Sequence, residues 1–361
     1  MSDEGEQAER MIEKRKFDHV EICAKEDLST PYIYWDDVKL VHNALPEIDL
    51  DEIDTSLTLF GHTLKAPIII SAMTGGYGKA REINKNLAAV AEQFGVGMGV
   101  GSQRAALENR DLADTYSVIK EFEVPLRIGN LGVPQLVKQG LRPPLGIDEG
   151  KEAIAMIDAH VLAIHLNYLQ EVVQPEGDTK AKGALKALEK FASALPVIAK
   201  ETGAGVSRDV ALKVKKAKVK GIDVGGLGGT SFSAVEYFRA KSAGDATRAN
   251  IGQTFWDWGI PTPVAVVLSC VGLPLVATGG VRSGLDIARA LSIGASSAGV
   301  AGRLLPAALQ SKDRLSLELK TMIDELRAAM FLVGARNIQE LSATKAMIIG
   351  RSREWLDHLM E

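Results

Sequence analysis

The chain has 361 residues, of which 46% are hydrophobic and 24% charged, a composition typical of a folded globular protein and not of a disordered one. Its 42 basic and 46 acidic residues give a net charge of −4, so we expect no broad cationic surface for nucleic acid. Two cysteines, Cys23 and Cys270, exclude a disulfide framework and a multi-cysteine metal site, and they fit a reducing compartment.

The N-terminal residues 1–16 change from acidic to basic and contain no apolar stretch of the kind found in secretion signals. The longest uncharged run, 258–281, is interrupted by Pro261, Pro263 and Pro274. These prolines predict a buried helix followed by a strand instead of a membrane span. We therefore expect a cytoplasmic protein with no membrane partner.

Eight short apolar runs recur along the chain and end in small or polar residues: 66–73, 96–102, 126–130, 161–167, 196–201, 221–225, 274–279 and 296–301. Continuous apolar runs are typical of parallel strands buried on both faces. Helical patterns lie between them, as in 79–94, and Ser283 with Asp286 has the spacing of a capping box. The alternation predicts an α/β fold, a (β/α)8 TIM barrel, with a doubly wound sheet as the alternative.

Residues 1–361 are expected to form a single domain, because the chain shows no clear linker, internal repeat or low-complexity segment. Residues 1–60 precede the first apolar run and are interpreted as an N-terminal extension. The spacing between the sixth and seventh runs is the longest, so 230–262 is interpreted as a loop insertion after the sixth strand.

Polar groups follow nearly every apolar run. They include Thr74, the Ser102-Gln103-Arg104 segment, Asn130, His165 with Asn167, and Lys200. Because active sites of such barrels lie at the C-terminal ends of the strands, this pattern predicts a functional site at that end.

The last two strand ends predict a phosphate site. Gly279 and Gly280 allow close backbone approach to an anion, Arg282 can pair with it, and Ala298-Gly299 offers a second close approach. In these barrels the loops after strands seven and eight commonly hold a phosphate. The alternative is two glycine turns beside a surface arginine.

Lys200 ends an apolar run and should point into the barrel mouth. A lysine there needs an anionic partner, because an unpaired buried ammonium is costly. It could be a Schiff-base nucleophile, the partner of an anionic cofactor, or a solvated lysine at a strand end.

Two further clusters could serve an anionic substrate. Glu171, close behind His165 and Asn167, is a candidate Mg²⁺ ligand together with phosphate oxygens, although it could equally be a solvated loop acid. Arg15 and Lys16 fit a solvated basic face or an arm that reaches a polyanionic substrate.

Six motifs, in this order and spacing, resemble type 2 isopentenyl-diphosphate isomerases, the FMN-dependent family: RKFDH at 15–19, MTGG at 73–76, GSQR at 101–104, HLNYLQE at 165–171, GGTS at 228–231 and GGVRSG at 279–284. The resemblance covers nearly the whole chain, from Arg15 to about Arg351. It implies a homo-oligomeric barrel, tetrameric or octameric, that interconverts isopentenyl and dimethylallyl diphosphates. It also implies FMN, NADPH as reductant, and Mg²⁺.

The resemblance assigns residues to roles. Those implied to bind the flavin are Ala72, Met73, Thr74, Ser102, Asn130, Lys200 and Thr230, with Gly280, Val281, Arg282, Ala298 and Gly299 at its phosphate. Those implied to bind substrate, partly from the extension, are Arg15, Lys16, Ser102, Gln103, Arg104, His165, Asn167 and Gln170. Glu171 is the implied Mg²⁺ ligand, and Gln170, His165 and Lys200 are the expected catalytic residues.

Moving a double bond by one carbon requires one proton to be added and another removed, and an unactivated alkene is a very weak base. The implied mechanism therefore uses reduced FMN as acid and base, Gln170 to position or relay a proton, and Mg²⁺ to anchor the diphosphate. The alternatives are an FMN-dependent barrel oxidoreductase of the hydroxy-acid oxidase or inosinate-dehydrogenase type, a Schiff-base aldolase that uses Lys200, and a non-catalytic phosphate-ligand sensor.

Overall fold

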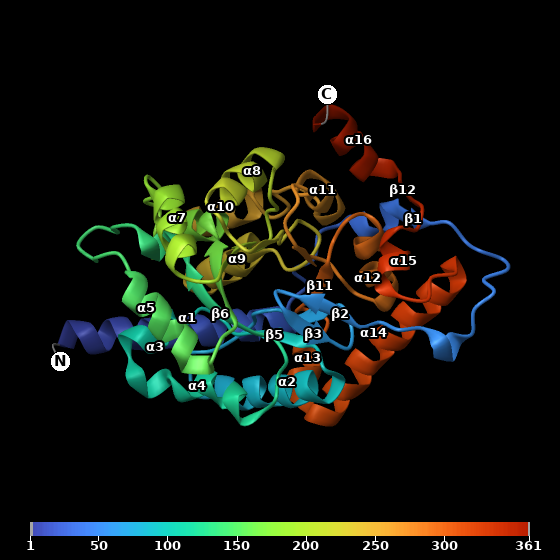
Figure 1. Cartoon of the computed structure of the whole chain (residues 1–361). Coiled ribbons are helices and arrows are strands. Elements are labelled where there is room, and N and C mark those ends of the chain that lie inside the picture. The colour runs from blue at the N-terminus through green and yellow to red at the C-terminus, as the bar shows by residue number, and fades with distance from the viewer. Residues whose placement is uncertain (1–2, 360–361) are drawn as a thin grey trace.

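The computed structural model describes the backbone of residues 3–359 and the side chains of residues 13–359. Eight parallel strands close into a barrel, which confirms the predicted fold class (Figure 1). In chain order the strands are β4 (Ile68–Ile70), β5 (Gly97–Gly99), β6 (Arg127–Gly132), β7 (Val161–Leu166), β8 (Val197–Glu201), β9 (Gly221–Asp223), β10 (Leu275–Thr278) and β11 (Ser297–Val300). Each lies within one of the eight apolar runs or extends it by two residues, as β6 does.

Helices surround the barrel. They are α2 (Ala80–Phe94), α3 (Arg104–Glu108), α4 (Asp114–Ser117), α5 (Ile147–Ile157), α6 (Tyr168–Val173), α7 (Ala184–Ala194), α8 (Arg208–Lys216), α11 (Thr262–Leu268), α12 (Gly284–Ser292), α13 (Leu305–Gln310), α14 (Lys312–Val333) and α15 (Ile338–Ser342). Short 3-10 helices are η1 (Tyr34–Asp37), η2 (Leu50–Glu52), η3 (Arg110–Leu112), η4 (Val118–Glu121) and η5 (Val133–Leu136). The predicted cap is present: Ser283 accepts from the Asp286 N–H at the start of α12.

The lower part of the barrel interior is apolar. Ile69, Ile128, Ile198 and neighbouring strand residues pack there against Leu59 and Leu64 of the hairpin formed by β2 (Leu57–Leu59) and β3 (His62–Leu64). The hairpin closes the N-terminal end of the barrel, so the interior can open only at the C-terminal end of the strands.

The N-terminal extension reaches both the barrel and the C-terminal segment. Helix α1 (Asp3–Lys25) projects from the body at the N-terminus (Figure 1). Strand β1 (Val38–Leu40) pairs antiparallel with β12 (Ala346–Ile348), which precedes α16 (Gly350–Leu359). The single domain over 1–361 and the 1–60 extension stay predictions, and residues 1–2 and 360–361 lie outside the described part of the chain.

The insertion at 230–262 follows the sixth barrel strand, as predicted, but its interpretation as a loop is wrong. It folds into α9 (Phe232–Ser242) and α10 (Ala246–Thr254), which pack on each other. Two side chains begin these helices: Ser231 accepts from the Ala234 N–H, and Asp245 from the Arg248 N–H. The length of the segment between two strands therefore did not show whether it is helical. The capping residues Ser231 and Asp245 were the better indication of helices.

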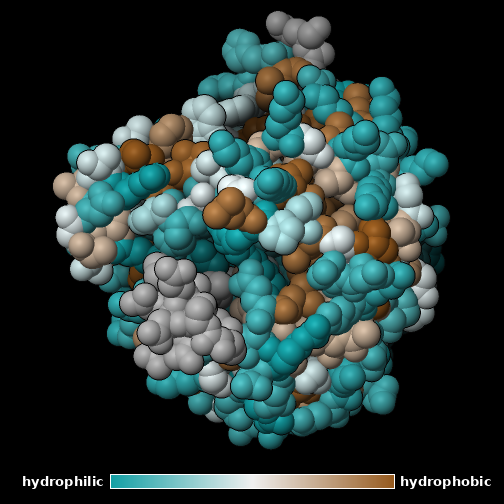
Figure 2. Space-filling view, turned by 90° about the vertical axis from the view of Figure 1, so that its left-hand side faces the viewer, coloured by the Kyte–Doolittle hydropathy of each residue, from teal (hydrophilic) through white to brown (hydrophobic). Residues whose placement is uncertain are grey.

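Hydrophobic groups form separate patches among hydrophilic ones on the face shown in Figure 2. Within residues 3–359, no helix combines the length and the apolar character needed to cross a membrane.

Candidate active site

A layer of polar side chains crosses neighbouring strands at the C-terminal mouth of the barrel. His165 of β7 is in register with Lys200 of β8, and Lys200 is in register with Asp223 of β9. Residues in register on neighbouring strands project from the same face of a sheet. The three side chains therefore lie next to one another, above the apolar lower interior.

Lys200 and Asp223 form a buried ion pair in this layer. Lys200 Nζ lies 2.7 Å from Asp223 Oδ2, and the side chains are 10% and 8% exposed. Both residues line a small cavity together with Ala72, Gly99 and Asn130. Lys200 thus points into the mouth, as predicted. An ammonium has three N–H donors, and Asp223 is the acceptor for one of them.

His165 is held as a neutral ring. Asn130 donates through Nδ2 to the Val100 carbonyl at 3.0 Å, which leaves its Oδ1 to accept from His165 Nδ1 at 2.8 Å. Burial, together with the charges of Lys200 and Lys16, lowers the pKa of His165 to about 3. The proton is therefore on Nδ1, and Nε2 keeps its lone pair.

Gln103 is fully buried and contacts the backbone of Asn130, the residue that accepts from His165. Its Nε2 donates to the Ala153 carbonyl at 2.8 Å, and its Oε1 accepts from the Asn130 N–H at 2.9 Å. Both ends of the amide are occupied by backbone groups, so the side chain positions Asn130. Its expected contact with substrate stays a prediction.

Three loops meet beside the mouth in a cradle of backbone. Gly279 and Gly280 have φ values of 118° and 67°, which favour glycine, and a Cβ on Gly280 would lie 2.4 Å from the Gly228 carbonyl oxygen. Thr230 Oγ1 lies 3.5 Å from the position of a Cβ on Gly302, after β11. Such close approach of backbone at the start of a helix suits a phosphate group.

The other residues predicted at the flavin lie around the same end of the barrel. Arg282, beside the cradle, is 40% exposed and is ion-paired with Asp36 and Asp286, each at 3.3 Å. Val281 is buried next to it. Ala298 and Gly299 are on β11. Ala72, Met73 and Thr74 follow β4, and Ser102 follows β5.

The extension brings a basic cluster to the mouth. Lys16 Nζ donates to the carbonyls of Gly75 and Ser102 at 2.8 and 2.7 Å and to the Tyr116 hydroxyl at 2.7 Å. Burial, with the charges of Arg15 and Arg104, lowers the pKa of Lys16 to about 7. The three predicted cations are therefore neighbours, although they come from distant parts of the chain.

Acidic residues hold the two arginines of this cluster. Arg104 donates to Glu108 at 2.7 Å and to Asp178 at 2.8 Å, and Arg15 lies 3.8 Å from Glu176. Such pairing fixes the guanidinium groups in a partly buried site while leaving them charged.

Glu171 is buried, and its carboxylate accepts three hydrogen bonds in this structure. Its Oε1 accepts from Asn167 at 3.0 Å, and its Oε2 accepts from Gln174 at 2.6 Å and from the Asp178 N–H at 2.7 Å. Burial raises the pKa of this carboxyl, and the hydrogen bonds partly oppose the rise. A carboxylate offers about four acceptor positions, so one is left on Oε1 for a cation.

Gln170 contacts Glu236, an acidic residue that was not predicted from the sequence. Its Nε2 donates to Glu236 Oε1 at 3.3 Å, and His19 Nε2 lies 2.8 Å from the same oxygen. Burial alone would raise the pKa of Glu236, but His19 and Arg239 outweigh it and lower the pKa to about 2. Glu236 is therefore a fixed negative charge beside Gln170.

Four contributors to the site were not singled out from the sequence: Tyr116, Asp178, Asp223 and Glu236. Asp223 had a usable signal, since an aspartate inside an apolar run is unusual. Glu236 had none, because it lies on an insertion interpreted as a loop. The structure brings the predicted residues to one end of the barrel, and their roles stay predictions.

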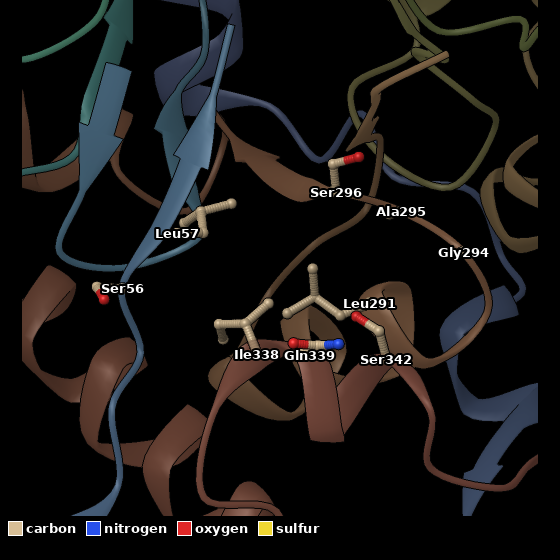
Figure 3. Close-up of a pocket in the computed structure, with 9 residues that line it drawn as sticks. All are labelled: Ser56, Leu57, Leu291, Gly294, Ala295, Ser296, Ile338, Gln339 and Ser342. Atoms are coloured by element: carbon tan, nitrogen blue, oxygen red, sulfur yellow. The ribbon is translucent and has the colours of Figure 1, made fainter. Parts of the chain in front are cut away.

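A second hollow in the described part of the chain lies away from the barrel mouth. It has a volume of about 470 Å³ and is lined by Leu57, Leu291, Ile338 and neighbouring small or polar residues. In Figure 3 these three side chains point toward one another, between β2 and α15. The lining has no charged side chain and lies at the N-terminal end of the barrel, where residues of such folds serve stability.

Comparisons with known proteins identify the family of this chain. The model of the FMN-dependent dehydrogenase family matches residues 8–116 and 185–348. The isopentenyl-diphosphate delta-isomerase of Thermoplasma volcanium is 48% identical over 96% of this chain and all of its own length. Those of Picrophilus torridus and Archaeoglobus fulgidus are 44% and 45% identical, over 96% and 95% of this chain and 99% and 98% of their own.

Solved structures show the same fold at low identity. A mandelate oxidase variant with a monooxide FMN adduct has a TM-score of 0.59 and 17% identity, covering 96% of this chain and 100% of that one. A lactate oxidase of Pediococcus acidilactici has a TM-score of 0.57 and 15% identity, covering 96% and 94%. Matches over nearly the whole length at more than 40% identity decide the family: the chain belongs to the FMN-dependent dehydrogenase family and, within it, to the isopentenyl-diphosphate delta-isomerases.

Proposed function

We propose that this protein interconverts isopentenyl and dimethylallyl diphosphates with FMN bound at the barrel mouth. The observation that carries the proposal is a convergence. The polar layer around Lys200, the glycine cradle at Gly280 and the basic cluster around Lys16 all lie at the C-terminal end of one barrel. Membership of the isomerase family supports the same function.

The residues at the mouth fit FMN. The backbone cradle at Gly280, together with Val281, Arg282, Ala298 and Gly299 next to it, would take the phosphate. Lys200 has N–H donors left for the polar edge of the ring, and Ala72, Met73, Thr74, Ser102, Asn130 and Thr230 would hold the rest of the cofactor. Reduced FMN, when bound, supplies negative charge and a transferable proton.

The diphosphate of the substrate would be bound by Arg15, Lys16 and Arg104, whose charges already lie together. His165 and Asn167 would add contacts from the end of β7. The apolar lower interior closes the floor of the site to water from the N-terminal end of the barrel. Gln170 would position a proton through its amide, which Glu236 orients.

Mg²⁺ would bind between Glu171 and the diphosphate. Among the described residues, no group of three or more His, Cys, Asp and Glu side chains could hold a metal ion alone. The single acceptor position left on Glu171 fits an ion that takes its other ligands from phosphate and water.

Three further features complete the proposal. NADPH would keep the flavin reduced, the protein would work in the cytoplasm, and it would form a homo-oligomer, a tetramer or an octamer.

The deciding experiment is an absorption spectrum followed by an anaerobic assay of isopentenyl diphosphate with and without a flavin reductant. We expect a flavin spectrum, isomerisation only after reduction, and no stoichiometric consumption of NADPH. Flavin without isomerisation in the reduced state would favour the oxidoreductase alternative. A protein that does not bind FMN, but is trapped by borohydride with a carbonyl substrate, would favour the aldolase.

A further inference from the structure

We propose that Asp223 is a positioning residue of the flavin site: it fixes the ammonium of Lys200 and offsets the positive charge that Lys200 presents to the polar edge of the flavin. This inference rests on the proposed function, because it takes FMN to lie against Lys200.

The geometry gives Asp223 a fixed carboxylate. Oδ2 lies 2.7 Å from Lys200 Nζ, and Oδ1 accepts from the Gly225 N–H at 3.3 Å. Gly225 has a φ of 42°, and a Cβ there would lie 1.9 Å from the Glu201 carbonyl oxygen, so the backbone behind the carboxylate is tightly packed. Lys200 is therefore held from one side, and its remaining N–H donors are free for the cavity that both residues line.

The charges of the layer nearly cancel. His165 is neutral, since burial and the nearby lysines lower its pKa to about 3. Lys200 contributes one positive charge and Asp223 one negative charge, 2.7 Å apart. In a buried site a lone ammonium would strongly favour negative charge on a neighbouring ring, whereas a close ion pair acts mainly as a dipole.

This balance matters for acid–base chemistry. A group that exchanges protons works best when neither of its protonation states is strongly over-stabilised. Lys200 alone would over-stabilise an anion at the ring edge and weaken it as a base. Asp223 moderates that effect while keeping Lys200 in place to bind the cofactor.

The test measures the reduction potential of bound FMN and its dissociation constant in the full-length protein, at about pH 6, where amines keep their proton. The variants are Asp223→Asn, Asp223→Ser, Asp223→Glu, Lys200→Met and the double variant Asp223→Asn with Lys200→Met. In Asp223→Asn and Asp223→Ser we expect the preference for reduced over oxidised FMN to increase by about tenfold, because the ammonium is no longer offset. Asp223→Glu keeps the charge and should stay near the wild-type potential.

The double variant separates positioning from a general structural effect. If Asp223 positions Lys200, the effect of Asp223→Asn on the affinity for FMN should disappear once Lys200 is gone. The direct effect of the carboxylate charge on the potential does not depend on Lys200 and should remain in the double variant. An unchanged or lowered preference for reduced FMN in whichever neutral variant folds, or an effect of Asp223→Asn on the affinity for FMN that is equally large without Lys200, would overturn the inference.

Failure of the proposed function would look different. If Lys200→Met itself changes neither the potential nor the affinity for FMN, the cofactor does not lie against Lys200. If Lys200→Met changes them and neither neutral variant of Asp223 does, the proposed function stands and only the role of Asp223 is refuted.

Discussion

Trp35 and Gly279 are 244 residues apart in the chain, yet the indole Nε1 of Trp35 donates to the Gly279 carbonyl at 2.9 Å. Trp35 is 2% exposed and belongs to η1 of the N-terminal extension. The neighbouring Asp36 is ion-paired with Arg282. The extension therefore contacts the glycine cradle directly, and not only the basic cluster at the mouth.

Trp35→Phe should weaken binding of FMN more than binding of riboflavin, which lacks the phosphate. The substitution keeps most of the packing but removes one hydrogen bond to the cradle, about 1 kcal/mol or roughly fivefold in affinity. Fluorescence titration of both flavins measures the effect. Trp355→Phe, at a partly exposed position on α16, is the control and should bind both flavins as the wild type does. Equal losses for FMN and riboflavin in Trp35→Phe would contradict a role at the phosphate.

The barrel could be predicted because its strands are buried on both faces, which leaves continuous apolar runs such as 161–167 and 196–201 in the sequence. The helices of the insertion could not be predicted. Helices α9 and α10 pack on each other, and α9 also packs on the extension, so their apolar residues follow no simple one-faced pattern. Helix caps at Ser231 and Asp245 were the only local signals, and such residues are equally common in loops.

The site was predictable where residues end a strand, as Lys200 does, and where glycines mark a close backbone approach, as Gly280 does. The residues that contact these site residues could not be predicted. Nothing in the order of residues links Lys16 to Tyr116, which lies 100 positions away. Tyr116 is found only when the path of the extension is known, and the pairing of Asp223 with Lys200 only when the register of the strands is known.

Glu171→Gln should raise the concentration of Mg²⁺ needed for half-maximal isomerisation by at least tenfold. The amide keeps the shape of the side chain but loses the charge and one acceptor, and Mg²⁺ prefers carboxylate oxygens. The measurement is a titration of activity with Mg²⁺ at saturating FMN. Glu149→Gln, a change of an N-terminal acid on α5, serves as control and should leave the requirement for Mg²⁺ unchanged. The same requirement in Glu171→Gln as in the wild type would show that Glu171 is not a ligand.

Glu236→Gln should destabilise the protein at neutral pH and much less in acid. The pKa of Glu236 falls from 4.5 to about 2 on folding, so its contribution is fully present above about pH 4.5 and is lost as the pH falls toward 2. The shift corresponds to about 3 kcal/mol. Urea unfolding at several pH values should show the difference from wild type shrinking below pH 4.5. Glu340→Gln, at a surface ion pair, should change stability far less. A difference that is constant with pH would contradict the assignment.

Binding of pyrophosphate, used as a probe of the basic cluster, should take up protons near neutral pH. Lys16 has a pKa of about 7 in the free protein because it is buried beside Arg15 and Arg104. A bound polyanion outweighs those positive charges and raises the pKa, so an amine that is partly neutral at about pH 7.5 gains a proton on binding. Calorimetry in buffers of different ionisation enthalpy measures the number of protons taken up.

The variants identify the group that takes up the proton. Lys16→Arg stays charged throughout, so it should bind pyrophosphate with less uptake than the wild type, by up to about one proton per site. Lys14→Arg, a change at an exposed neighbour on the same helix, should behave as the wild type. Tyr116→Phe removes one of the three oxygens that hold the Lys16 ammonium and should weaken binding of pyrophosphate severalfold. Uptake in Lys16→Arg equal to that of the wild type would place the titrating group elsewhere, with His165 the next residue to test.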